Sequence, residues 1–258
     1  MIKHSEILKS DWDILIVLDA CRYDIFKEVV GSEFFGSVIQ EADSEAGCTR
    51  GWLDKHFKGS TDFRDVVYIS GNPYINSYGI GLKTKEIFYD VFDSWEYRYD
   101  NTDRVEPVGV FLDAKKTLMY ARNRVIVHFL QPHYPYLFDS KKFNPLDLIY
   151  KLVPNKIIKK INKVFKRNKI NKDNTKNTIS RIEETYQLVY TDEQIRDAYT
   201  NNLISIIPYL KKLISEEKNK KIVVTADHSE YLGENGRYGH GGKINGFINK
   251  VPYVVIEV

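Results

Sequence analysis

The apolar residues of this chain gather in five short runs rich in Val and Ile, each bounded by polar residues or turn formers. Runs of this length and composition are typical of β-strands. Their apolar residues follow one another almost continuously, which is the pattern of strands covered on both faces. The five predicted strands are residues 13–19, 66–70, 124–130, 221–227 and 253–258.

Helical patterns fill much of the sequence between these runs. Strands separated by helices favour right-handed crossovers and a mostly parallel sheet with helices on both faces. We therefore predict an α/β protein with a single domain over residues 1–258, a size at which one core can bury about 70–75% of the unfolded surface. The predicted helices are residues 22–30, 49–58, 84–93, 111–122, 145–167 and 189–216.

Carboxylate and imidazole side chains stand where the predicted strands end. Asp19 closes the first strand, and the pair Asp227-His228 closes the fourth. The third strand passes His128 and is followed by His133. Ligands of such sheets bind beyond the carboxyl ends of the strands, and Asp with His suits Zn²⁺, Mn²⁺ or a similar divalent ion. We therefore predict a metal site at this edge of the sheet.

Two further polar residues belong to this group. Asn72 follows the second strand, and His240 lies beside glycines that permit close approach of the backbone. Structural interpretations stay open: Asp19 could cap the next helix, His133 could be an ordered loop residue, and Asn72 could form a turn. His128 could be a core residue. We interpret His4 and His56 as structural or surface residues, and Arg22 and Asp24 as structural residues of a helix start.

Composition adds an expectation about the compartment. The two cysteines, Cys21 and Cys48, are too few for a disulfide framework and suit a reducing environment. Neither a signal peptide nor an apolar run of about 18 residues is present. We therefore expect a cytoplasmic protein. A net charge of +3 gives no indication of nucleic-acid binding, and the oligomeric state stays open.

Positive charge is concentrated in residues 156–172, which hold eight Lys or Arg and no acidic residue. Apolar residues recur in it at helical spacing, so we predict a basic amphipathic helix within an insertion at about 140–180. Such a helix can pack on the core with its lysines in solvent. The alternative is peripheral contact with an anionic membrane surface or a polyanionic substrate.

Three stretches resemble the alkaline phosphatase and sulfatase superfamily. "ILIVLDACRYD" is similar to its opening strand and metal-binding Asp, here Asp19. "TADHSEYLGENGRYGHGGK" is similar to its late Asp-His pair and Gly-His histidine, and "FLQPHYPY" is similar to the segment with another active-site histidine. The resemblance covers almost the whole chain. It implies an alkaline-phosphatase-like fold and a metal-dependent enzyme that acts on anionic esters.

The resemblance also implies a nucleophile in "EAGCTRGWL", residues 45–53. Sulfatases carry Cys-x-Pro-x-Arg, and Cys48 is followed by neither the proline nor the arginine, which argues against a sulfatase. The phosphodiesterase and phosphotransferase branches use a threonine, which Thr49 matches. It stands at the start of a predicted helix, where free N–H groups favour an anion. Cys48 stays the alternative nucleophile, and Thr49 could also be a helix cap.

The superfamily's first metal site corresponds here to Asp19, Thr49, Asp227 and His228. The resemblance implies that His133 and His240 hold a second metal or bind the phosphate. The aspartate of the superfamily's second site is missing from "HFLQPH", although His128 could replace it. The cofactor is thus one or two divalent ions of Zn, Mn, Mg or Ca. Asn72 and Lys243 are the implied substrate-binding residues, although Lys243 could equally be a solvated surface lysine.

We therefore expect a metal-dependent hydrolase or transferase of phosphate mono- or diesters, acting on a small-molecule, glycan-linked or lipid-linked anionic ester. One alternative is a sulfatase-like hydrolase of sulfuric esters. Another is a catalytically degenerate protein that binds an anionic glycan or lipid headgroup. A dinucleotide-dependent dehydrogenase is excluded, because no G-x-G-x-x-G follows the first strand.

Overall fold

The computed structural model describes residues 1–80, 82–97, 105–120, 123–136, 190–241 and 244–258. The basic segment 156–172, the rest of the predicted insertion and Lys243 lie outside the described residues, so these predictions stay untested. None of the helices in the described part of the chain combines the length and apolar character that a membrane span needs.

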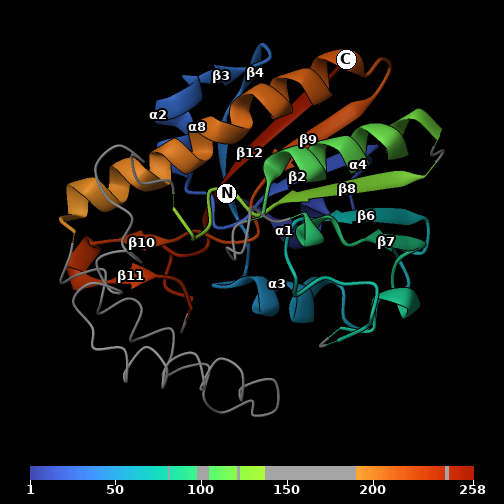
Figure 1. Ribbon diagram of the computed structural model, residues 1–258, viewed down its shortest axis with the longest axis horizontal. Helices are drawn as coiled ribbons and strands as arrows, with labels where there is room; N and C mark the ends of the chain where they lie inside the picture. Colours follow the sequence, from blue (N-terminus) through green and yellow to red (C-terminus); the bar gives the residue numbers. More distant parts are fainter. Residues whose placement is uncertain (81, 98–104, 121–122, 137–189, 242–243) are drawn as a thin grey trace.

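An eight-stranded sheet runs through the molecule (Figure 1). Its strand order is β1 (Ile2–Lys3), β5 (Gln40–Asp43), β12 (Lys250–Glu257), β9 (Lys221–Thr225), β2 (Ile14–Leu18), β8 (Arg124–Phe129), β6 (Val66–Ser70) and β7 (Asp90–Phe92). The five strands from β9 to β7 are parallel, and β12 is antiparallel to both of its neighbours. The predicted mostly parallel α/β sheet is thereby confirmed.

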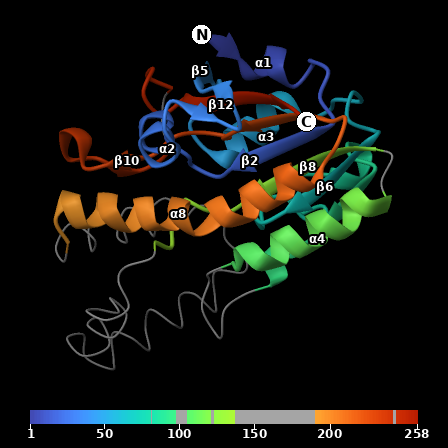
Figure 2. The ribbon, with the colours of Figure 1, turned by 90° about the horizontal axis from the view of Figure 1, so that it is seen from above.

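Helices cover both faces of the sheet. The helices α4 (Pro107–Tyr120) and α8 (Asp192–Glu216) lie against one face, and α3 (Thr49–His56) lies against the other (Figures 1 and 2). All five residues of β2 and of β6 are buried, which explains their continuous apolar pattern. The smaller elements are α1 (His4–Ile7), α2 (Tyr23–Val30), the pairs β3 (Glu33–Phe34) with β4 (Ser37–Val38) and β10 (Tyr231–Leu232) with β11 (Tyr238–Gly239), and 3-10 turns at Thr84–Glu86, Ser94–Glu96 and Glu234–Gly236.

The helix predicted over residues 84–93 is wrong. Thr84–Glu86 form a single 3-10 turn, and Asp90–Phe92 form β7, which pairs parallel with β6 at the edge of the sheet. The buried Ile87 and Val91 are four residues apart, a spacing that fits one face of either a helix or a strand. Pairing with β6 decides between the two, and no local pattern reports it.

The buried residue His4 ties α3 to the sheet. Its Nδ1 accepts a 2.9 Å hydrogen bond from the indole N–H of Trp52 on α3, and its Nε2 lies 2.9 Å from Oγ1 of Thr225, the last residue of β9. Burial lowers the pKa of His4 to about 3, so the ring is neutral and Nε2 carries its proton. The helix that begins at Thr49 is therefore fixed against the end of β9.

Candidate active site

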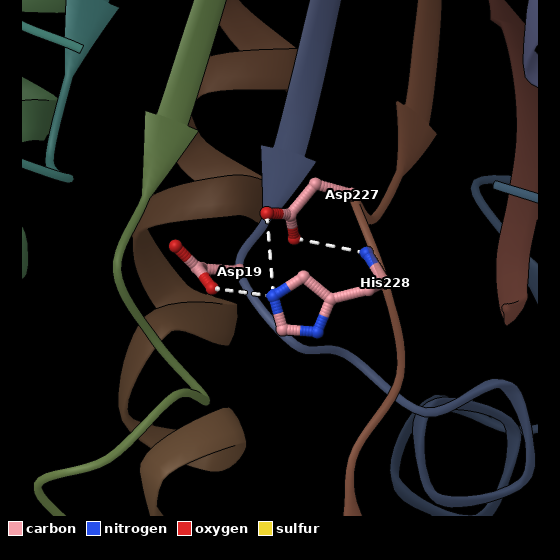
Figure 3. A group of neighbouring side chains, drawn as sticks. All are labelled: Asp19, Asp227 and His228. Atoms are coloured by element: carbon pink, nitrogen blue, oxygen red, sulfur yellow. Dashed lines mark hydrogen bonds and ion pairs between the residues drawn. The ribbon is translucent and has the colours of Figure 1, made fainter. Parts of the chain in front are cut away.

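Three fully buried ligand-type side chains meet where two neighbouring parallel strands end (Figure 3). Asp19 follows β2, and Asp227 and His228 follow β9. The register pairs Val17 with Thr225, so both strands end at the same level. One ligand atom from each of the three side chains lies within 4.8 Å of the other two. The sheet register therefore builds the cluster that the sequence predicted.

Two carboxylate oxygens of this cluster face one imidazole nitrogen. The Nε2 atom of His228 lies 3.5 Å from Oδ1 of Asp19 and 3.5 Å from Oδ2 of Asp227. Both of these oxygens are buried and have no hydrogen-bond partner among the described residues. An unpaired buried carboxylate oxygen is costly unless a cation compensates it. The arrangement fits a divalent cation bound between the three side chains.

The tautomer of His228 leaves Nε2 free to bind a cation. Its Nδ1 lies 2.8 Å from the carbonyl oxygen of Ser229. Because a carbonyl only accepts, Nδ1 donates and carries the proton, and Nε2 keeps a lone pair. Burial lowers the pKa of His228 well below its usual value, with a smaller contribution from His240. The ring is therefore neutral, as a metal ligand must be.

The two carboxylates have opposite pKa shifts. Burial raises the pKa of Asp227 to about 7, and the neighbouring charge of Asp19 adds to this effect. Burial acts in the same direction on Asp19, but the nearby His133, His128 and His228 outweigh it and hold the pKa of Asp19 below its usual value. Like charges this close do not both ionise readily. A cation would relieve this repulsion, which also supports the fit of a divalent ion.

Thr49 reaches into the same cluster from α3. The residue is buried at the first position of the helix, and its Oγ1 lies 3.3 Å from Nε2 of His228. The N-cap of this helix is Cys48, whose Sγ accepts a 3.4 Å hydrogen bond from the N–H of Gly51. The alternative role of Thr49 as the helix cap is therefore filled by Cys48. The Thr49 hydroxyl faces the cluster instead.

Asn72 closes the cluster from the end of β6. Its Nδ2 donates to Oδ2 of Asp19 and lies 3.4 Å from Oγ1 of Thr49. The other amide atom, Oδ1, accepts the N–H of Tyr74 at 2.9 Å. That bond turns the NH₂ group toward the site, so a donor faces any anion bound beside Thr49 and Asp19.

Two more histidines line the same site. The ring centroids of His133 and His240 are 4.8 Å apart, and that of His240 lies 4.3 Å from that of His228. The Nδ1 atom of His240 lies 3.3 Å from Oε1 of the buried Glu230. Burial by itself lowers the pKa of His240, but the bond to Glu230 and its charge outweigh this and raise it. The contact with Glu230 therefore favours the protonated form of His240 beside the carboxylate cluster.

His128 is buried but lies beside the site. Its Nδ1 pairs with the hydroxyl group of Tyr68 at 2.7 Å, and its Nε2 lies 3.3 Å from Oδ2 of Asp19. Arg22 forms ion pairs with Asp24 and Glu234 at the start of α2, which agrees with a structural role for Arg22 and Asp24.

The structure brings most of the predicted site residues together. They are Asp19, Thr49, Asn72, His133, Asp227, His228 and His240, with Cys48 at the margin.

Sequence reasoning missed two residues that hold the histidines. Glu230 stands two positions after His228, and an acidic residue this close to a strand end was the available signal. Asn202 donates to the carbonyl of His133 from α8, within the apolar stripe of that helix. An amide in such a stripe needs a buried partner, which the sequence alone does not identify.

Comparison with known proteins shows similarity in fold alone. No family model and no curated protein matches this chain. The soluble domain of lipooligosaccharide phosphoethanolamine transferase A from Neisseria meningitidis matches with a TM-score of 0.55 and 15% identity, over 94% of this chain and 75% of that one. The integral membrane form of that transferase matches with a TM-score of 0.54 and 15% identity, over 96% of this chain and 48% of that one.

Two further solved structures have the same fold. The C-terminal periplasmic domain of EcEptC from Escherichia coli, in complex with Zn, matches with a TM-score of 0.52 and 8% identity, over 96% of this chain and 74% of that one. A 2-O GAG sulfatase matches with a TM-score of 0.51 and 13% identity, over 95% and 64%. This chain therefore has the fold that a phosphoethanolamine transferase domain and a sulfatase share.

Proposed function

We propose that this protein is a metal-dependent enzyme that hydrolyses or transfers phosphate esters, with Thr49 as the nucleophile. The observation that carries the proposal is the position of the Thr49 hydroxyl. It lies at the start of α3, 3.3 Å from Nε2 of His228 and beside two unpaired carboxylate oxygens. A hydroxyl among cation ligands at a helix start is placed to react with an anionic ester.

Asp19, Asp227, His228 and Thr49 would hold the cation. Carboxylate, imidazole and hydroxyl donors fit Zn²⁺ and Mn²⁺, and the structure of EcEptC in complex with Zn supports Zn²⁺ as the first ion to test. A bound divalent ion would supply charge that lowers the pKa of the threonine hydroxyl and neutralises phosphate oxygens. Without that charge a threonine is a weak nucleophile near neutral pH.

In the proposed reaction, Thr49, the histidines His133 and His240, and Asn72 have separate tasks. The Oγ1 atom of Thr49 would give up its proton to bulk water and form a bond to phosphorus while the bond from phosphorus to the leaving oxygen breaks. The cationic His240, held by Glu230, donates the proton that the leaving oxygen takes. The NH₂ group of Asn72 and the ring of His133 bind the phosphate oxygens. Water or an acceptor hydroxyl would then give its proton to the neutral His240 and displace Thr49 from phosphorus, which completes hydrolysis or transfer and restores the cationic imidazole.

The environment of Cys48 favours Thr49 over the cysteine. The Cys48 sulfur caps α3 by accepting the N–H of Gly51, so its lone pairs face the helix. The Oγ1 atom of Thr49, in contrast, has His228 and Asn72 as partners. Together with the missing Cys-x-Pro-x-Arg, this makes a sulfatase of the formylglycine type the weaker candidate.

For the substrate we propose an anionic ester on a glycan or lipid. The similar structures include one transferase named for lipooligosaccharide and one sulfatase named for a GAG, which supports a glycan-linked or lipid-linked ester as the substrate to test. Membrane contact through residues 156–167 stays part of this proposal. So does a cytoplasmic location, because Cys21 and Cys48 are both free thiols. The EcEptC structure is named as a periplasmic domain, so cell fractionation is the test of the cytoplasmic location proposed for this chain.

Turnover with defined metals tests the proposal. The protein is stripped with a chelator, reloaded with Zn²⁺, Mn²⁺, Mg²⁺ or Ca²⁺, and assayed with nitrophenyl phosphate, bis-nitrophenyl phosphate and nitrophenyl sulfate. We expect metal-dependent release of nitrophenol from a phosphate ester. Turnover of the sulfate alone would favour the sulfatase. Tight metal and phosphate binding without any turnover would favour a protein that only binds its ligand.

A further inference from the structure

The buried face of α8 carries an amide where an apolar residue would be expected. The stripe of this helix that packs on the core contains Ala198, Tyr199, Asn202, Leu203 and Ile206. Asn202 is 1% exposed. Burying an amide costs free energy unless its hydrogen bonds are made, so its partners show what it does.

Three hydrogen-bond contacts of the Asn202 amide reach one loop beside the candidate active site. Its Nδ2 lies 3.2, 3.1 and 3.0 Å from the carbonyl oxygens of Pro132, His133 and Pro135. Carbonyl oxygens only accept, so the amide atom that faces them is the nitrogen, and its orientation is unambiguous. One side chain therefore holds the backbone on both sides of His133.

Other contacts hold the same loop at different points. The main-chain N–H of His133 donates to the carbonyl of Asp19 at 3.1 Å, and the side chain of Gln131 donates to the carbonyl of Val105 at 2.8 Å. These bonds fix the loop along the sheet edge. The Asn202 amide adds contacts from α8. The loop is otherwise a run of two prolines and two tyrosines with few N–H groups of its own to pair.

We propose that Asn202 is the positioning residue for His133, and that it sets the distance between this imidazole and the cluster of Asp19, Asp227 and His228. The inference rests on the proposed function in assigning phosphate binding to His133. Asn202 itself touches neither the phosphate nor the cation. It acts through the loop backbone, so its loss loosens the anion site and leaves the cation site, built on strand ends, in place.

A matched pair of substitutions on one helix tests this. Asn202→Asp replaces the donor with an oxygen that faces three carbonyl oxygens, and Asn201→Asp makes the same chemical change at an exposed position. Asn202→Ala, which introduces no charge, serves if the aspartate variant does not fold. In the zinc-loaded protein we expect the Asn202 variants to bind inorganic phosphate roughly tenfold or more weakly. Their zinc affinity and that of Asn201→Asp should match the unchanged protein.

A double-mutant cycle separates positioning from general destabilisation. In a His133→Ala background, Asn202→Ala should cause no further loss of phosphate affinity, because the group through which it acts is gone. Additive losses, or equal weakening of zinc and phosphate binding by Asn202→Ala, would overturn the inference.

A spectroscopic readout keeps the inference testable even if the proposed function fails. The protein has six histidines, so the imidazole signal of His133 can be assigned by NMR through its loss in His133→Ala. In the metal-free protein we expect Asn202→Ala to shift or broaden this signal and to leave that of His4 unchanged. An unchanged His133 signal would show that Asn202 does not position the ring. Absence of phosphate binding by the unchanged protein would count against the proposed function alone.

Discussion

The two sides of the candidate active site are built in different ways. On the cation side, Asp19 and Asp227 stand directly at the ends of adjacent parallel strands, and the main-chain N–H of Ala20 donates to Oδ1 of Asp227 at 3.1 Å. On the histidine side, His133 and His240 stand on loops. Side chains from elsewhere in the fold contribute to holding them there, Asn202 for the backbone of the first and Glu230 for the ring of the second.

This difference teaches where the site tolerates change. Strand ends are placed by many main-chain hydrogen bonds and by a buried core, so losing one ligand removes chemistry without moving its neighbours. The loop histidines depend in part on side-chain contacts, so a change outside the site can move them. We therefore expect large effects from ligands and the nucleophile, and smaller, graded effects from the residues that hold the histidines.

The largest effect should come from Thr49→Ala. Removing the proposed nucleophile leaves only binding and electrostatic contributions, so turnover of the best phosphate ester should fall by roughly a thousandfold or more. Zinc affinity should fall less, because Asp19, Asp227 and His228 remain. Steady-state kinetics and zinc titration on the same preparation measure both.

Cys48→Ser is the control for the nucleophile. Serine can also cap a helix, so α3 should keep its start and most activity should remain. Trapping the phosphorylated enzyme and mapping the modified peptide should place the phosphate on Thr49. Phosphate found on Cys48, or activity that survives Thr49→Ala and disappears with Cys48→Ser, would reassign the nucleophile to the cysteine.

Asp227→Asn should have the next largest effect. The amide is a weaker ligand than the carboxylate, so zinc affinity should fall by more than the roughly 10–100-fold seen when only the partner of a ligand is lost. Turnover at limiting zinc should fall in parallel. Elemental analysis and calorimetric titration provide the measurement, and full zinc content with full turnover would remove Asp227 from the cation site.

Zinc affinity should also depend on pH. In the metal-free protein, burial and the charge of Asp19 raise the pKa of Asp227 to about 7, and the cation binds the deprotonated form. Affinity should therefore rise by up to about tenfold per pH unit from pH 5 to 7 and level off above that, because one proton is released per ion bound. Asp227→Asn should lose this dependence, and a flat profile for the unchanged protein would contradict it.

Glu230→Gln tests the histidine side and should have a smaller effect than Thr49→Ala or Asp227→Asn. The amide keeps the shape of the carboxylate but removes the charge that raises the pKa of His240. Since a cationic His240 is the proposed proton donor, activity on the alkaline side should decline at a pH lower by about one unit. Zinc affinity should be unchanged. A pH–rate profile identical to that of the unchanged protein would exclude this role.

The sequence predicted that Asp19, Asp227 and His228 lie at one edge of the sheet, and the structure brings them together there, because the signals are local. Each ligand follows a run of buried β-branched residues, and parallel strands deliver their carboxyl ends to one edge. The helix predicted over residues 84–93 was wrong, because Asp90–Phe92 pair with β6 as a strand at the sheet edge. The residues that hold the histidines were missed for a related reason. Asn202 and His133 are 69 residues apart and meet only through the packing of α8.

Sequence by itself determined the α/β class, the mostly parallel sheet and the ends of β2 and β9 as the place where Asp19 meets Asp227 and His228. Hydrophobic period and strand-end position carry that information within a few residues. Tertiary structure alone decided that Cys48 caps α3 while Thr49 faces the cluster, and that Asn202 and Glu230 hold the two loop histidines. Those outcomes depend on which buried polar groups contact each other across the core, and no local sequence pattern encodes contacts between residues far apart in the chain.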